Sequence, residues 1–221
     1  MALLYNAWIY AVEHANEFGG AVNDHLELVV TALGVGILIC IPLGIWTSRS
    51  KIASATFMSV INGLRVLPSL AVLFIVVPVL GLSSASATFA LIILVLPPIL
   101  INTDAAFRNI PKSILEAARG MGMTTSQVLL KIEFPLAMPV ILAGVRTAVV
   151  EVISSATLAA FVGSGGLGIY ITRGFALYDQ SILLVGAIPV ALLTVLAEAM
   201  LTGMQHLVEI PDGQAQSRNK G

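Results

Sequence analysis

Charged residues are scarce in this chain. They make up 10% of its 221 residues, against about 25% in a typical soluble domain, whereas hydrophobic residues make up 57%. The formal net charge is -1, which offers no basic field to nucleic acid, and we expect no nucleic-acid partner. The composition excludes an ordinary soluble domain and indicates a protein that lies in a membrane.

Residues and motifs that form disulfides, bind metals or hold nucleotides are equally scarce. Cys40 is the only cysteine, so the chain can form no intrachain disulfide. The three histidines are far apart and lack the spacing of a metal site, so we predict no bound metal. No segment matches Gly-x-x-x-x-Gly-Lys-Ser/Thr, the loop whose backbone amides hold nucleotide phosphates. We therefore predict that the chain is not an enzyme and binds no cofactor of its own.

Long apolar runs dominate the sequence. A helix needs about 20 such residues to cross roughly 30 Å of hydrocarbon. Five runs approach or exceed this length: Leu26 to Trp46, Ala55 to Leu80, Ala85 to Ile101, Leu136 to Phe161 and Ile182 to Met204. Several contain proline, which is tolerable at depth only where neighbouring helices shelter the freed carbonyls. These runs predict an all-α integral membrane protein with about five transmembrane helices, forming one domain over residues 25–207.

The two ends of the chain have different compositions. Ala2 to Phe18 is mildly amphipathic and holds Trp8 and Tyr10, which predicts a helix at the membrane interface within an external segment of residues 1–24. No Lys or Arg precedes Arg49, which argues against a signal peptide. Residues 208–221 are polar and predict a disordered cytoplasmic tail.

Basic residues predict the orientation, because Lys and Arg in short loops stay on the cytoplasmic side. Eight lie in loops or ends that share one side: Arg49, Lys51, Arg108, Lys112, Arg119, Lys131, Arg218 and Lys220. Only Arg173 lies on the other side. The N-terminus is therefore predicted outside and the C-terminus in the cytoplasm.

The longest predicted cytoplasmic loop, residues 105–135, has the pattern of two short helices. Ser113 is placed to cap a helix that runs to Met121, with Glu116 at the third following position as in a capping box. Gly122 would end that helix, and a second amphipathic helix is predicted over 125–132. Such a hairpin projects from the membrane and predicts a docking element.

One pattern in this loop resembles a known family. Glu116-Ala117-Ala118, Gly122, Ile132 and Pro135 resemble the EAA loop of ABC importer permeases, with Phe134 where the family has Leu. The resemblance implies the type I ABC importer permease fold, and a loop that contacts the ATPase. It assigns this contact to Glu116, Ala117, Ala118, Gly122, Ile132 and Pro135. The alternative is an ordinary amphipathic hairpin on the membrane surface.

Other stretches extend the resemblance to permeases for osmoprotectants such as glycine betaine, carnitine and choline. They are Leu64 to Ala71, Leu96 to Thr103, Gly144 to Ala148 and Phe161 to Gly168. The last stretch also resembles methionine importer permeases, so methionine or another amino-acid derivative remains the alternative substrate.

The resemblance also implies partners and a location. It implies two ATPase subunits that bind ATP and Mg²⁺, a second permease subunit, identical or not, and an extracytoplasmic substrate-binding protein. The implied location is a bacterial plasma (inner) membrane. A transporter driven by an ion gradient would predict inverted internal repeats, and the sequence contains no such repeat.

Ionisable residues inside the apolar runs are candidate functional groups, since a charge at helix centre costs roughly 2.5–3.5 kcal/mol. They are Arg65, Arg146, Glu151 and Glu198. Arg65 or Glu151 would face a translocation path in one interpretation. In the other, which we favour, these residues form structural pairs between helices.

The segment Gly163 to Gly168 has four glycines in six residues and cannot continue a stable helix. Ser164, Gly165 and Gly166 are therefore candidates for a gate hinge or a receptor contact. A tight surface turn explains the same composition equally well.

Overall fold

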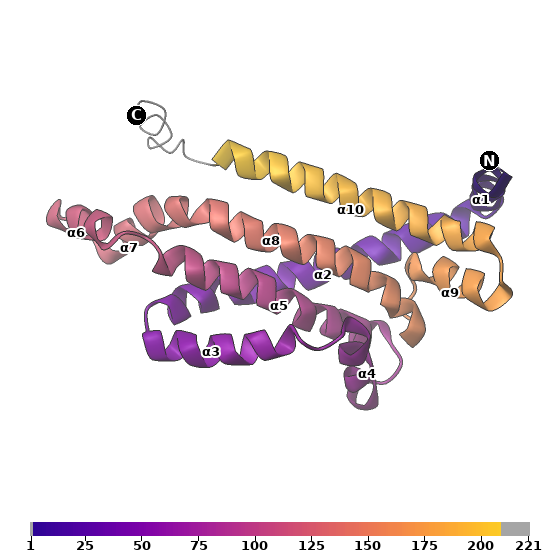
Figure 1. Cartoon of the computed structure of the whole chain (residues 1–221), viewed down its shortest axis with the longest axis horizontal. Coiled ribbons are helices and arrows are strands. Elements are labelled where there is room, and N and C mark those ends of the chain that lie inside the picture. Colours follow the sequence, from indigo (N-terminus) through magenta and orange to yellow (C-terminus); the bar gives the residue numbers. More distant parts are fainter. Residues whose placement is uncertain (1, 209–221) are drawn as a thin grey trace, which may run out of the picture.

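Four long helices lie side by side along the longest dimension of the protein (Figure 1). They are α2 (Ala15–Ser48), α5 (Ser84–Arg108), α8 (Phe134–Ala156) and α10 (Gln180–Val208). This computed structural model describes residues 2–208, and within that range every regular element is a helix. Each of the four is long and apolar enough to cross a membrane. The all-helical membrane fold predicted from composition is confirmed.

The fifth predicted span is not one helix. Helix α3 (Lys51–Leu64) and helix α4 (Ser69–Leu80) meet at an angle of 95°. Pro68 causes the break, since it has no backbone N–H to donate and disfavours helical geometry in the residue before it. The run from Ala55 to Leu80, predicted as one span, is thus divided into two helices, which together count as a fifth candidate span. The break places Arg65, the residue directly after α3, at the bend between α3 and α4.

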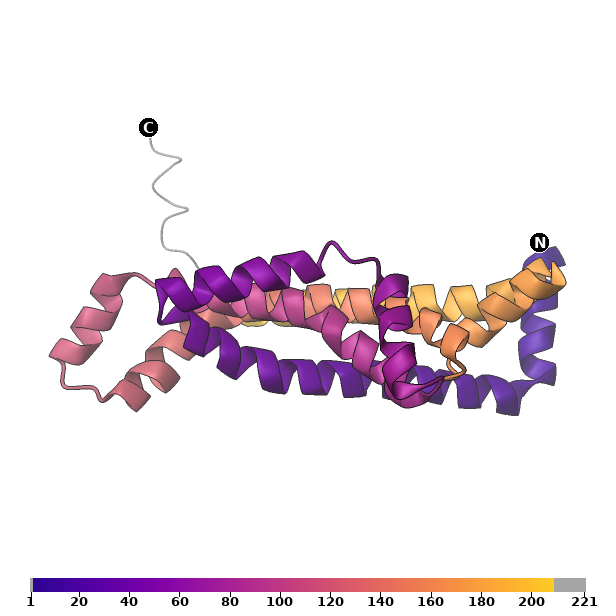
Figure 2. The same ribbon diagram turned by 90° about the horizontal axis from the view of Figure 1, so that it is seen from below.

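Short helices form the two ends of the bundle (Figure 2). At one end, here called the loop end, lie α6 (Lys112–Gly120), α7 (Thr125–Val128) and the π-helix η1 (Leu129–Glu133). At the opposite end, here called the α1 end, lie α1 (Ala2–Glu13) and α9 (Gly168–Leu177). The 3₁₀ helix η2 (Thr157–Val162) connects α8 to the glycine-rich segment before α9.

The first long helix begins earlier than its apolar run. Helix α2 starts at Ala15, directly after His14, whereas the run begins at Leu26. The predicted external segment of residues 1–24 therefore holds α1 and the first turns of α2. From residue 209 onward, the predicted cytoplasmic tail lies outside the described residues.

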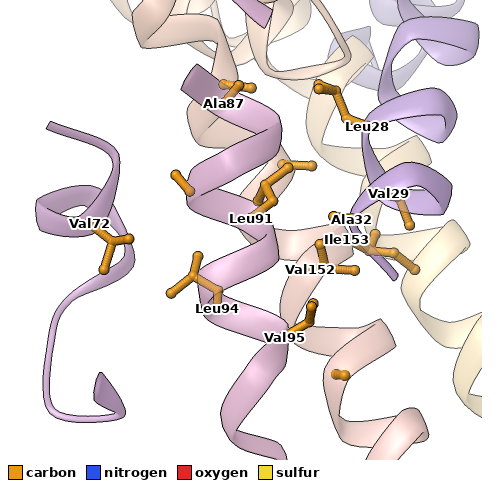
Figure 3. Close-up of a cluster of buried hydrophobic side chains, with 14 of the residues drawn as sticks. Leu28, Val29, Ala32, Val72, Ala87, Leu91, Leu94, Val95, Val152 and Ile153 are labelled. Carbon is orange, nitrogen blue, oxygen red and sulfur yellow. The ribbon is translucent and has the colours of Figure 1, made fainter. Parts of the chain in front are cut away.

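Helix α5 is the centre of the bundle and packs against α2, α4 and α8 (Figure 3). Its contacts depend on small residues on the neighbours. A Cβ atom at Gly44 of α2 would lie 2.6 Å from Thr103 Cγ2, and one at Gly144 of α8 would lie 2.7 Å from the carbonyl oxygen of Pro98. Glycine at these positions lets the backbones approach closely, which is how helices gain packing energy in lipid. Figure 3 labels part of the core: Leu28, Val29, Ala32, Val72, Ala87, Leu91, Leu94, Val95, Val152 and Ile153.

Candidate functional site: a loop at one end and a polar stripe

Helix α6 (Lys112–Gly120), which carries the Glu-Ala-Ala triplet, begins two residues earlier than predicted. Pro111 is its N-cap residue, and no side chain caps the first turn. The fixed φ of proline suits a helix start, so Ser113 lies inside the helix and the predicted capping box at Ser113 and Glu116 was wrong. The predicted end is confirmed, because Gly122 follows the helix with φ +83°, a left-handed conformation that favours glycine.

A capping box is present at the next helix, where the sequence reading had not placed one. The Thr124 hydroxyl accepts a hydrogen bond from the Gln127 N–H at 3.4 Å, and Gln127 Oε1 accepts one from the Thr124 N–H at 2.8 Å. The signal was visible in the sequence as Thr-x-x-Gln just before an apolar stretch. It fixes the start of α7, which continues through η1 into α8 without a turn.

The residues that the resemblance assigns to the ATPase contact differ in exposure. Glu116, Ala117, Gly122 and Pro135 are exposed, and Ile132 is half-buried. Ala118 is only 2% exposed and packs inside the loop. The hairpin therefore presents one edge of the triplet to a partner, while Ala118 holds α6 against the rest of the loop.

The same loop exposes apolar side chains at the loop end. Ile114, Met121 and Leu130 are exposed, and Met121 retains 76% of its accessible surface. Apolar side chains grouped on a charged, short-helix loop are typical of a protein interaction site. The loop therefore exposes apolar side chains beside Glu116 and several basic residues, a surface typical of a contact with another protein.

A buried carboxylate connects this loop to the first long helix. Glu133, the last residue of η1, is 2% exposed, and Arg49 at the end of α2 binds both of its oxygens, at 2.8 and 2.5 Å. The guanidinium of Arg49 also lies over the Phe107 ring, 5.9 Å from its centroid. The hydrogen bond to Glu133 raises the pKa of Arg49. This pair was not predicted from the sequence, because 84 residues separate its members.

A second polar cluster lies next to it. Buried Asp104 of α5 accepts hydrogen bonds from Thr47 at 2.8 Å, from Ser54 at 3.1 Å and from Arg108 at 3.0 and 3.1 Å. These partners come from α2, α3 and α5. The cluster joins the loop-end termini of three helices, and its only sequence signal was an aspartate four residues before an arginine.

The intramembrane charges separate into two groups. Arg146 of α8 pairs with Glu198 of α10 at 3.5 Å and donates to Thr202 at 3.2 Å. This pair joins α8 to α10, as the structural interpretation predicts for these two residues. Arg65 and Glu151 are exposed and form no ion pair within the described residues, so the favoured structural pairing is not found for these two.

Glu151 belongs to a polar stripe on α8. Thr147, Glu151 and Ser154 are exposed and spaced four and three residues apart, so they share one face of the helix. Exposed polar groups at this depth are costly in lipid. The stripe fits a face that borders water or another protein subunit.

The glycine-rich segment packs closely at the α1 end. Gly163, Gly165 and Gly166 have φ of +74°, +84° and +79°, values that favour glycine. A Cβ at Gly165 would lie 2.7 Å from a carboxylate oxygen of Asp24, and one at Gly168 would lie 1.9 Å from the carbonyl oxygen of Thr157. The segment is thus a tight turn fixed against α2 and η2.

Ser164 in this turn lines a pocket of about 150 Å³. Its hydroxyl is buried and has no hydrogen-bond partner among the described residues. The other lining side chains include two carboxylates, Asp24 and Glu27. The pocket is therefore acidic and opens at the α1 end.

Some aromatic residues at the α1 end are buried, and others are exposed. Tyr170 is buried against Tyr10, and Arg173 lies over the Tyr170 ring at 5.8 Å and donates to Tyr10 Oη at 3.2 Å. That hydrogen bond raises the pKa of Arg173. Tyr178 is 95% exposed in a left-handed conformation, with φ +54°. A large aromatic side chain held in this way offers a contact to a partner outside the membrane.

Known proteins share both the fold and much of the sequence. The model of the family described as "Binding-protein-dependent transport system inner membrane component" matches residues 40–209. The choline transport system permease protein OpuBB of Bacillus subtilis is 39% identical over 85% of this chain and 90% of its own length. The carnitine transport permease protein OpuCB of Listeria monocytogenes is 40% identical over 83% of this chain and 84% of its own length.

Solved structures agree on the fold. An inward-facing structure of the MetNI methionine ABC transporter covers 87% of this chain and 96% of its own chain, with a TM-score of 0.75 and 22% identity. At this identity the likeness concerns the fold alone, whereas the family match covers most of the sequence. The chain therefore belongs to the family of binding-protein-dependent transport system inner membrane components.

Proposed function

We propose that this chain is the permease subunit of an ATP-driven importer of osmoprotectants, meaning quaternary ammonium compounds such as glycine betaine, carnitine and choline. The proposal rests chiefly on the relatives at about 40% identity, which are named as choline and carnitine permeases and match most of this chain. Methionine is the less favoured substrate, because its supporting structures are only 20–22% identical.

The loop of residues 105–135 is proposed to contact the ATPase. The exposed residues Glu116, Ala117 and Gly122 would touch the ATPase subunit directly. Half-buried Ile132 and exposed Pro135 would set the angle at which the loop meets α8. Ala118 would act by packing within the loop, since it is buried. The exposed Met121 and Leu130 would add apolar contact area.

The polar stripe is proposed to border the translocation path. Arg65 at the α3–α4 bend and Glu151 on α8 are exposed and opposite in charge. A second permease subunit facing this stripe would enclose a water-lined route and remove both charges from lipid. Ser164, Gly165 and Gly166 would form part of an outer gate beside Asp24.

The proposed assembly contains two permease subunits, two ATPases and an extracytoplasmic substrate-binding protein, in a bacterial inner membrane. The loop end would face the cytoplasm, and the α1 end would face the binding protein. ATP and Mg²⁺ would bind to the ATPase subunits, with no cofactor on this chain.

Uptake into proteoliposomes tests the proposal. The chain, with its own ATPase and binding protein, is reconstituted and supplied with labelled glycine betaine, carnitine or choline. We expect ATP-dependent uptake of at least one, lost when Glu116→Ala is combined with Gly122→Asp. Ser113→Ala is the matched control, because Ser113 is exposed on the same helix and caps nothing.

Each outcome decides a different part of the proposal. ATP-driven uptake of methionine alone would reject the osmoprotectant substrate and keep the importer. Uptake driven by an ion gradient, without any ATPase, would reject the importer as well.

A further inference from the structure

The loop of residues 105–135 is here called the coupling loop. The Arg49–Glu133 pair lies where this loop meets the spanning helices. Glu133 ends the π-helix η1, and α8 begins at the next residue. A π-helical turn is an irregular, wider turn that often marks a functional position in a helix. A tilt of the loop relative to α8 therefore has a natural pivot at η1 and displaces the Glu133 carboxylate.

Arg49 is fixed on the other side of this contact. Its N–H donates to the Trp46 carbonyl at 3.2 Å, which holds it to the last turn of α2. Its guanidinium binds both oxygens of Glu133 and lies over Phe107 of α5. One side chain thus contacts the coupling loop, α2 and α5 together.

The contact has little freedom to slip. Two parallel N–H···O bonds fix the angle between guanidinium and carboxylate as well as their distance. Glu133 is almost fully buried, so a carboxylate that loses this partner cannot turn to water. The Arg49 side chain is 45% exposed, so it is the buried Glu133 that keeps the two groups together when the loop moves.

The Asp104 cluster extends the connection. Thr47, two residues before Arg49, and Ser54 of α3 both donate to Asp104 of α5. Arg108 closes the cluster by donating to Asp104 and, at 3.4 Å, to the Thr47 carbonyl. The loop-end termini of α2, α3 and α5 are joined and would move as one unit.

We propose that the Arg49–Glu133 pair transmits the movement of the coupling loop to α2, α3 and α5. Arg49 and Glu133 are positioning residues in this inference, which rests on the proposed function, because it presumes an ATPase that moves the loop. Without the pair, the loop would still bind the ATPase, but its tilt would be absorbed at η1.

Coupling efficiency tests the inference. The measured quantity is the number of ATP molecules hydrolysed per solute imported by the full complex in proteoliposomes. Arg49→Lys keeps the positive charge but removes the bidentate hydrogen bonding to Glu133 and the cation–π contact with Phe107. We expect this variant and Glu133→Gln to bind the ATPase normally and to raise the ratio at least fivefold.

The ratio is measured on complexes that retain the ATPase through purification, because an ATPase released from a misfolded permease would add hydrolysis without import. Lys51→Gln is the matched control, since Lys51 is an exposed basic residue two positions away with no ion pair among the described residues. It should leave the ratio unchanged.

The outcomes are distinct. A wild-type ratio in Arg49→Lys, or an equal loss of hydrolysis and uptake, would overturn the inference, because the pair would then be dispensable or merely structural. A wild-type complex without any ATP-driven uptake would instead overturn the proposed function.

Discussion

At the scale of single residues, the closest backbone contact in the α1 end involves Gly168. A Cβ atom there would lie 1.9 Å from the Thr157 carbonyl oxygen, so Gly168→Ala must separate α9 from η2. We expect a loss of about 1–3 kcal/mol, typical of overpacking, seen as a lower melting temperature in detergent. Gly203→Ala is the control, because nothing lies within 4 Å of its Cβ position. Equal melting temperatures for the two variants would contradict the described turn.

Glu151 offers a test of the polar stripe. Its carboxylate is exposed at membrane depth and would favour a cation over a zwitterion in a water-lined path. We expect Glu151→Gln to lower choline uptake severalfold relative to glycine betaine uptake, measured in the same proteoliposomes. Thr147→Ala, on the same face, should change both rates equally. Unchanged selectivity in Glu151→Gln would remove Glu151 from the path.

Pairings at this scale were the least predictable from sequence. The glycines, the charges and the Glu-Ala-Ala triplet were all visible as candidates. Their partners were not, because Arg49 and Glu133 are 84 positions apart and no local pattern connects them. The exposure of Ala117 against the burial of Ala118 likewise depends on how α6 packs, which its amphipathic pattern alone does not determine.

At the scale of elements, the capping box at Thr124 controls the start of α7. Thr124→Ala removes the hydroxyl that accepts from the Gln127 N–H, and we expect a loss of about 1 kcal/mol in local stability. Hydrogen exchange of the amides from 125 to 130 should accelerate about fivefold. Thr125→Ala, one residue further and exposed, should have little effect. Equal exchange in both variants would show that packing, rather than the cap, fixes α7.

The presence of the spanning helices was predictable from the sequence. Their bends and their exact ends were less predictable. Apolar runs predicted the spans because lipid demands about 20 apolar residues per crossing, whatever the neighbours are. The 95° bend between α3 and α4 was not predicted, although the run was known to contain proline, because a proline can kink a span or end it. The cap of α6 was misplaced because Pro111 and Ser113 both suit a helix start, and Pro111 takes the position.

At the scale of the whole molecule, the two ends of the bundle should face opposite sides of the membrane. Cys40 is fully buried, so the unsubstituted chain should react poorly with a membrane-impermeant maleimide. Met121→Cys, at the loop end, should be labelled only from the cytoplasmic side. Tyr178→Cys, at the α1 end, should be labelled only from outside. The reverse pattern would invert the proposed orientation, and labelling of the unsubstituted chain is the background control.

The length of α2 has a consequence for the membrane that holds it. A helix of 34 residues is about 51 Å long, far more than the hydrocarbon thickness. The stretch from Leu28 to Thr47 is about 30 Å long and lies between Glu27 and Arg49, so these two charges mark the limits of the nonpolar layer. A thicker bilayer would have to tilt the helix, or draw Glu27 or Arg49 toward lipid. Bilayer thickness, set by acyl-chain length, therefore acts on the same arginine that binds the coupling loop.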